Sequence, residues 1–191
     1  MPQTLITTLR YTEPFSINPL VGAVGTYTFS ANGLYDPNIT SSGHQPMGFD
    51  QLMTFYNHYE VIGAKIKMSI VPSSEVTGFN FGIKLDDNGT LAAAGLDTVC
   101  EHAMVSFKTH PGVGFSNGFD VYSTYSAKKF FGDKAGDRET WGDASSNPTD
   151  QAYFICFIAG MTSLQDIGAV PCMATIEYVV KFHEAKDLTY S

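Results

Sequence analysis

Alternation of apolar and polar residues with a period of two is the feature that most constrains this sequence. It is clearest in the segments 61–71, 77–85 and 174–183, where every second residue is apolar. In the last of them the apolar positions are Ala174, Ile176, Tyr178, Val180 and Phe182. A period of two places one set of side chains in a core and the other in water, which indicates β-strands of a packed sheet.

Turn-forming residues divide the chain into about eight such strands. We predict them at 4–17, 24–31, 60–72, 77–86, 101–109, 117–130, 151–161 and 171–185. The segment 153–158 is apolar at every position, so we expect that strand to be covered on both faces. Residues 48–59 carry apolar residues at mixed helical spacing, which predicts a short helix between the second and third strands. Eight antiparallel strands with long connections suit two packed sheets, either a jelly roll or a closed barrel.

Composition and charge narrow the class of protein. Hydrophobic residues fill 43% of the 191 positions, and 18 Gly and 9 Pro indicate many turns, so we expect one globular domain over residues 1–191. The formal net charge is −8, and the sequence contains no run of basic residues. This argues against a protein whose main role is electrostatic binding of nucleic acid. No apolar run reaches the roughly 18 residues of a membrane helix, and no signal-peptide pattern opens the chain, so we expect no membrane insertion.

Residue types that carry catalysis or bind metals are scattered along the chain. The five His and three Cys form no HxH, HExxH or CxxC spacing, and no nucleophile or P-loop signature occurs. Cys100, Cys156 and Cys172 are expected to be buried, reduced thiols. We therefore predict no catalytic site, no metal site and no cofactor.

One segment of the sequence is distinctive. It reads ANGLYDPN at 31–38, GHQPMGFDQ at 43–51 and FYNHYEVIGAKI at 55–66. This pattern resembles the capsid proteins of small circular, Rep-encoding single-stranded-DNA viruses (CRESS-DNA, circovirus-like viruses). The rest of the chain resembles that family only in length and strand rhythm. Within the motif, Asn32 and Gly33 are expected to take positive φ angles that end the second strand sharply.

The resemblance implies an all-β fold: a single eight-stranded antiparallel jelly roll, with the short helix in the connection between strands C and D. It implies a structural protein, not an enzyme, whose main partner is itself. Copies of the family assemble into a small icosahedral shell, typically T=1 with sixty copies, around a circular single-stranded DNA genome. The implied location is the virion, with assembly in the host nucleus and a host receptor of unknown identity.

Capsid proteins of this kind usually begin with an Arg/Lys-rich arm that binds DNA and carries nuclear-import signals. Here the sequence opens at Met1 almost directly on the first predicted strand. Either the arm has been removed or this virus lacks one, so genome binding through an arm is not carried over. Contact with single-stranded DNA then depends on the shell itself.

A basic patch on the shell is one candidate for that contact. In a jelly roll the first, third, sixth and eighth strands share one sheet, and five basic residues fall on the polar parity of those strands: Arg10, Lys65, Lys67, Lys128 and Lys181. Asp120 and Glu177 share that parity and dilute the patch. An ordinary solvated or subunit-contacting face is the alternative interpretation.

Subunit contacts are expected in the polar loops at 35–45, 91–99 and 133–150. The residues that we expect to make subunit contacts or to lie in surface loops are Tyr35, His44, Gln45, Asp137 and Trp141. A rival hypothesis is a carbohydrate- or receptor-binding β-sandwich module, in which Trp141 and nearby Asp residues would form a sugar platform. The size of the protein in solution separates the two hypotheses.

Overall fold

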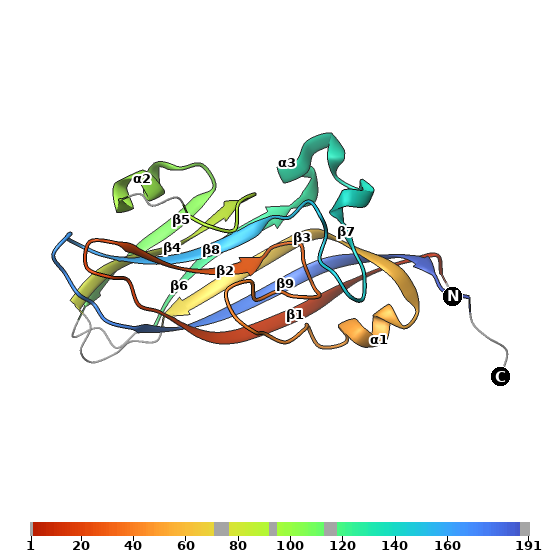
Figure 1. Cartoon of the computed structure of the whole chain (residues 1–191), viewed down its shortest axis with the longest axis horizontal. Coiled ribbons are helices and arrows are strands. Elements are labelled where there is room, and N and C mark those ends of the chain that lie inside the picture. Colours follow the sequence, from red (N-terminus) through yellow and green to blue (C-terminus); the bar gives the residue numbers. More distant parts are fainter. Residues whose placement is uncertain (1, 71–76, 92–94, 113–117, 188–191) are drawn as a thin grey trace.

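A computed structural model describes residues 2–70, 77–91, 95–112 and 118–187 as two antiparallel sheets packed face to face (Figure 1). Sheet A has the strand order β1 (Thr4–Ile17), β9 (Val170–Ala185), β3 (Tyr56–Ile70), β6 (Phe119–Ser126), and the two-residue β7 (Trp141–Gly142) also pairs with β3. Sheet B has the order β2 (Val24–Ser30), β8 (Tyr153–Gly160), β4 (Thr77–Asp86), β5 (Val105–Gly112). The eight long strands have the interleaved order of a jelly roll, which confirms the predicted fold class.

Short helices occupy the connections. They are α1 (Phe49–Met53), α2 (Leu96–Glu101) and α3 (Ala127–Phe131), with the 3-10 turns η1 (Gly132–Lys134) and η2 (Arg138–Thr140). The predicted helix between the second and third strands exists but ends at Met53, because the chain already enters β3 at Tyr56. None of the described helices is long and apolar enough to cross a membrane.

Three predicted strands have wrong boundaries, and one of them, expected at 60–72, begins already at Tyr56. The strand expected at 101–109 begins only at Val105, because α2 ends at Glu101 and a turn occupies residues 102–104. The strand expected at 117–130 ends at Ser126, where α3 begins. Residues 71, 72 and 117 of the predicted strands, and residues 92–94 of the loop predicted at 91–99, lie outside the described residues.

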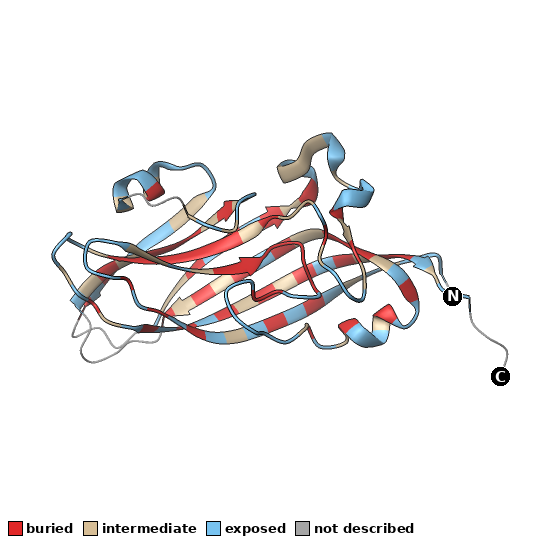
Figure 2. Cartoon of the chain, in the orientation of Figure 1, coloured by how far each residue is buried: buried red, intermediate tan, exposed pale blue. Residues whose placement is uncertain are grey.

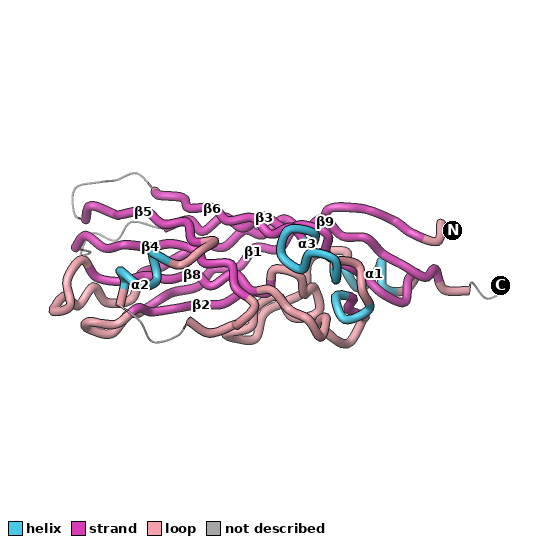
Figure 3. Tube along the Cα trace, turned by 90° about the horizontal axis from the view of Figure 1, so that it is seen from above, coloured by secondary structure: helices cyan, strands magenta, loops and turns pink. Residues whose placement is uncertain are grey.

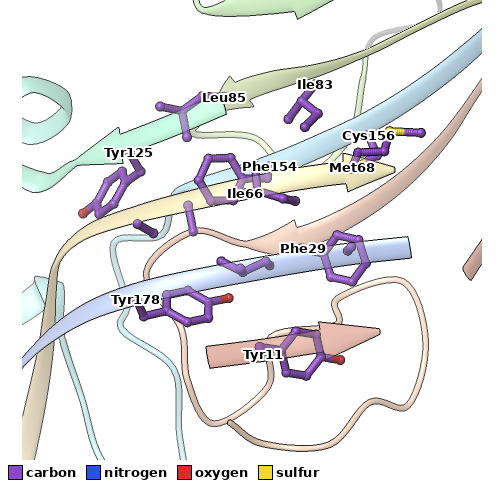
Figure 4. Close-up of a cluster of buried hydrophobic side chains, with 14 of the residues drawn as sticks. Tyr11, Phe29, Ile66, Met68, Ile83, Leu85, Tyr125, Phe154, Cys156 and Tyr178 are labelled. Carbon is purple, nitrogen blue, oxygen red and sulfur yellow. The ribbon is translucent and has the colours of Figure 1, made fainter. Parts of the chain in front are cut away.

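The core lies between the two sheets. Buried and exposed residues alternate along β1 and β9, as the period of two predicts (Figure 2). Aromatic rings fill much of the interior, and the ring centroids of Phe15 and Phe29 are 5.3 Å apart in an edge-to-face contact. Tyr178 from sheet A lies in the same cluster (Figure 4), and its hydroxyl donates to the Ser30 carbonyl of sheet B at 2.8 Å.

Strand β8 is buried on both faces, as predicted. Phe154, Cys156 and Ile158 belong to the main core, whereas Ile155 and Phe157 are fully buried on the other face of sheet B. The connection that contains α2 lies over this outer face (Figure 1). This second covering explains why the sequence of β8 shows no alternation.

The distinctive motif has structural roles that differ from those expected. Neither Asn32 nor Gly33 has a positive φ, so that prediction is wrong. The Asn32 side chain instead donates to the Asp150 carbonyl at 2.9 Å and accepts from the Ala152 N–H at 2.9 Å. Gly33 packs against the Asn147 side chain so closely that a Cβ would collide with it. The motif is therefore fixed to the start of β8 by side-chain contacts.

Acid should destabilise the fold through His110, which is 2% exposed and stacked on Phe79 with ring centroids 4.9 Å apart. Burial lowers the pKa of His110, and its Nδ1 accepts the Gly112 N–H at 3.1 Å, so the folded state holds the ring neutral. The unfolded chain takes up a proton near pH 6.5, and stability is therefore present above that pH and lost as the pH falls below it. We expect His110 to contribute a slope of up to about 1.4 kcal/mol per pH unit to the free energy of unfolding.

The His110→Asn variant tests this expectation, because Asn can still accept an N–H two residues along but does not titrate. Urea unfolding of the unassembled subunit between pH 8 and pH 5 should give a shallower pH dependence for the variant. The buried His183, whose pKa is also lowered, contributes in the same direction to both proteins. Equal slopes for the two proteins would contradict the expectation.

Candidate nucleic-acid interface and subunit-contact loops

Four of the five basic residues predicted to form a patch lie on the outer face of sheet A. Cross-strand pairing places Arg10 of β1 opposite Glu177 of β9, and Glu177 opposite Lys65 of β3. Lys67 lies two residues further along β3, and Lys181 two rows away along β9 on the same face. The central part of this face forms a shallow depression of about 410 Å³, lined by Arg10, Thr12, Lys65, Lys67, Tyr122, Thr175 and Glu177.

Ion pairs hold two of these cations in place. The Arg10 Nη2 lies 2.6 Å from Glu177 Oε1, with the two side chains 68% and 46% exposed. The Lys67 Nζ lies 4.0 Å from Asp120 Oδ2. Pairs as exposed as these contribute little to stability, so both cations remain available to a ligand.

The face is rich in cations for so acidic a protein. It holds four of the 11 Lys and Arg residues, against Asp120, Glu177 and the buried Glu60 at outward positions of the same strands. Further acidic residues, Glu184 beside His58 and those of the loop 132–150, lie at the Trp141 end of this face and not in the depression. Of the surfaces that the described residues form, the outer face of sheet A is thus a favourable one for a polyanion.

The structure corrects the placement of Lys128 and adds an aromatic residue. Lys128 is not on the sheet, because β6 ends at Ser126; it lies on α3, where its Nζ is 3.3 Å from Asp133 Oδ1. Tyr122 of β6 was not singled out from the sequence, yet it is 43% exposed and its ring lies 5.0 Å from the Lys65 Nζ. Its position in the alternation, an aromatic residue on the polar parity, was the signal that could have found it.

Residues of the loop 35–45 contact the sandwich edge. His44 stacks on Tyr11 with ring centroids 4.7 Å apart, and its Nδ1 lies 3.3 Å from Glu13 Oε2. Gln45 lies beside Asp50 at the start of α1. Tyr35 is 42% exposed. His44 and Gln45 are therefore engaged within the chain, whereas the Tyr35 side chain is available to a partner.

The loop 132–150 is docked on the outer face of sheet A by Trp141. The indole stacks on His183 with centroids 4.5 Å apart and an interplanar angle of 16°. His183 Nε2 in turn lies 3.3 Å from Glu60 Oε2, and both side chains are buried. Burial and the nearby Lys181 lower the pKa of His183, against the opposing effect of Glu60. Trp141 is thus an anchor of its own loop, and Asp137, four residues before it, is exposed.

Comparison with known proteins gives matches only in structure. No family model and no curated protein matches the sequence. The capsid protein of beak and feather disease virus (BFDV), a circovirus, matches in its 60-copy form with a TM-score of 0.54 and 14% identity over 98% of this chain and 97% of that one. Its decameric form gives a TM-score of 0.52 and 15% identity over 94% and 99% of the two chains. The structure of Cocksfoot mottle virus matches with a TM-score of 0.55 and 12% identity over 95% and 94%.

The chain has the jelly-roll fold of viral capsid proteins. At these identities the likeness concerns the fold, and the jelly roll accounts for nearly the whole chain. Within it the described residues contain no group of three or more His, Cys, Asp or Glu side chains placed to hold a metal ion. Two kinds of surface on this jelly roll are candidates for function: the outer face of sheet A, and the loops at the two ends of the sandwich.

Proposed function

We propose that residues 1–191 are the shell domain of the capsid protein of a small CRESS-DNA virus. Sixty copies assemble in a T=1 arrangement into an icosahedral shell, and the protein is a structural unit of the virion, assembled in the host nucleus, and not an enzyme. The observation that carries the proposal is the likeness in fold, over 98% of this chain, to a capsid protein solved as a 60-mer. The motif at 31–66 supports the same family independently of the fold.

Assembly of such a shell needs only modest contacts at each interface. Every copy meets its neighbours through the same surfaces, so a weak contact is repeated in a closed array and becomes collectively stable. The loops 35–45 and 133–150 supply exposed side chains for these contacts, among them Tyr35 and Asp137. No cofactor takes part in this mechanism.

The outer face of sheet A is proposed to face the packaged single-stranded DNA. Arg10, Lys65, Lys67 and Lys181 would meet phosphates, and Tyr122 offers an exposed ring on which a base could stack. Contacts of this kind are electrostatic and sequence-independent, as packaging of a whole genome requires. The rival hypothesis of a sugar-binding module has less support, because the Trp141 ring is occupied by His183.

The size of the purified protein tests the capsid proposal. Light scattering and negative-stain microscopy should show closed, uniform particles with a mass of about 1.2 MDa, the mass of sixty 20.8 kDa chains. Assembly should be tried over a range of salt concentration and pH, because the net charge of −8 opposes it at low ionic strength. A monomer or small oligomer under all these conditions would favour the binding-module hypothesis.

Reversing charge on sheet A should reduce the nucleic acid inside the particles. In the variant Lys65→Glu/Lys67→Glu we expect the nucleic acid per particle, measured by the ratio of absorbance at 260 and 280 nm, to fall by at least about threefold. The matched control is Lys128→Glu/Lys134→Glu, which makes the same charge change at exposed residues of α3 and η1, outside the strands of sheet A. Particles of normal size that package as much as wild type would exclude the proposed DNA contact.

A further inference from the structure

Four large apolar side chains are exposed at the tips of two neighbouring turns. The turn at 18–23 follows β1 and the turn at 161–169 precedes β9; both lie at one end of the sandwich, because Ile17 pairs with Val170. The exposed fractions are 76% for Leu20, 53% for Val21, 52% for Met161 and 88% for Leu164. We call these four residues the apolar tip. Isolated exposed apolar residues are common in proteins, but four on two adjacent turns make a patch that needs a covering.

The turns that carry the apolar tip are fixed to each other and to sheet B. The backbones meet at Gly22, where a Cβ would lie 3.0 Å from the Ser163 carbonyl oxygen. The Gln165 side chain accepts the Met161 N–H at 2.8 Å and donates to the Gly78 carbonyl of β4 at 2.9 Å. The apolar side chains are therefore presented on ordered backbone, so that little conformational entropy is lost when a partner covers them.

The near absence of charge on the two turns favours another copy of this chain as the partner. The two turns contain a single charged residue, Asp166, in a chain whose net charge is −8. Copies of an acidic protein repel each other least where the surface is uncharged. A membrane surface is disfavoured as a partner, since loops that bind membranes through apolar tips commonly add Lys or Arg, and neither turn carries one.

The position of the apolar tip suits a contact among several copies. The start of β1 and the end of β9 lie together at the opposite end of the sandwich, since Thr4 pairs with His183, and Figures 1 and 3 show these two strand ends side by side there. The apolar tip is thus at the end of the sandwich away from the start of β1 and the end of β9. Narrow loop ends of this kind can pack around a rotation axis, where each copy offers the same surface to the next.

We propose that the apolar tip, formed by Leu20, Val21, Met161 and Leu164, is a contact surface between copies of this chain in the shell. The proposal rests on the capsid function and specifies one of its interfaces. It differs from the expectation that contacts lie in the polar loops, because Leu20, Val21 and Leu164 fall between the predicted strands and Met161 at the end of the strand predicted at 151–161. Burial of these side chains against a neighbouring copy removes apolar surface from water, which favours the contact.

The test compares two double variants of the full chain. Leu20→Ser/Leu164→Ser removes the exposed apolar groups, whereas Leu20→Met/Leu164→Met keeps an apolar side chain of similar volume. We expect the Ser variant to need at least about a tenfold higher protein concentration to form particles, and the Met variant to assemble as wild type does. Thermal unfolding of the subunits should be nearly unchanged in both, since all the substituted side chains are exposed in the subunit.

Further measurements separate this inference from the proposed function. Wild-type protein that forms no particles would overturn the capsid function and the interface with it. Wild-type and Ser variants that assemble at the same concentration would overturn the interface alone. The variant Ile6→Ser, at a 60% exposed apolar residue on sheet A, should leave assembly unchanged, and an equal defect there would show that the effect is not specific to the tip. Flotation of wild type, but not of the Ser variant, with phosphatidylcholine–phosphatidylserine vesicles would assign the tip to a membrane and overturn the proposal.

Discussion

The subunit with Asn32→Ala should unfold about 6–12 °C below wild type, which corresponds to a loss of about 3 kcal/mol. Asn32 is 1% exposed, and its amide makes two hydrogen bonds, to the Asp150 carbonyl and from the Ala152 N–H. Alanine leaves both backbone groups without a partner inside the protein, where each costs about 1–3 kcal/mol. The backbone bond from Ala31 N–H to the Ala152 carbonyl, 2.7 Å long, depends on the same alignment of segments.

Two further variants distinguish this role from a general sensitivity to substitution. Asn32→Asp keeps the acceptor for Ala152 but turns a carboxylate oxygen toward the Asp150 carbonyl, so it should be at least as destabilising as alanine. Asn57→Ala removes an exposed amide in β3 and should leave the unfolding temperature within about 1 °C. An unfolding temperature of the Asn32→Ala subunit close to that of wild type would show that these two hydrogen bonds do not anchor the motif.

The strands could be predicted from the sequence because the packing of two sheets requires apolar and polar residues to alternate along each strand. The bounds of β1 and β4 agree with the expected segments. The prediction failed where a helix adjoins a strand. The sequence Ala127-Lys128-Lys129-Phe130-Phe131 is compatible with a helix and with a strand. Alternation of apolar and polar residues therefore gives no reason to end β6 at Ser126. That single boundary error is why Lys128 was assigned to the basic face.

Side-chain contacts between segments far apart in the chain could not be predicted from the sequence. The parity of Arg10, Lys65, Lys67 and Lys181 predicted a shared face, because parity is a local property of each strand. The stacking of Trp141 on His183 joins residues 42 positions apart, and no spacing rule connects them. The same is true of Asn32, whose role is set by β8 more than a hundred residues away.

Removal of one hydroxyl, in Tyr59→Phe, should loosen two loops at once. Tyr59 is fully buried, and its hydroxyl accepts the N–H groups of Leu34 at 3.0 Å and Tyr35 at 3.4 Å. It also lies 3.3 Å from Asn147 Oδ1, in the loop 132–150. Burial raises the pKa of Tyr59 above its usual range, so the hydroxyl is neutral near pH 7 and can serve as donor and acceptor. Phenylalanine keeps the edge contact with Phe49, at a centroid distance of 5.3 Å, and removes only the hydrogen bonds.

We expect Tyr59→Phe to lower the free energy of unfolding by about 2 kcal/mol and the unfolding temperature by about 4–8 °C. Amide hydrogen exchange should quicken at Leu34 and Tyr35, because both N–H groups lose their acceptor. Tyr178→Phe is the matched control: it removes another buried hydroxyl, which donates only to the Ser30 carbonyl, so exchange at Leu34 and Tyr35 should stay slow. If both variants quickened exchange at those two amides equally, the loops would be responding to lost stability in general. If only Tyr59→Phe does so and particles also form less readily, the hydroxyl holds the loops in the arrangement that neighbouring copies meet.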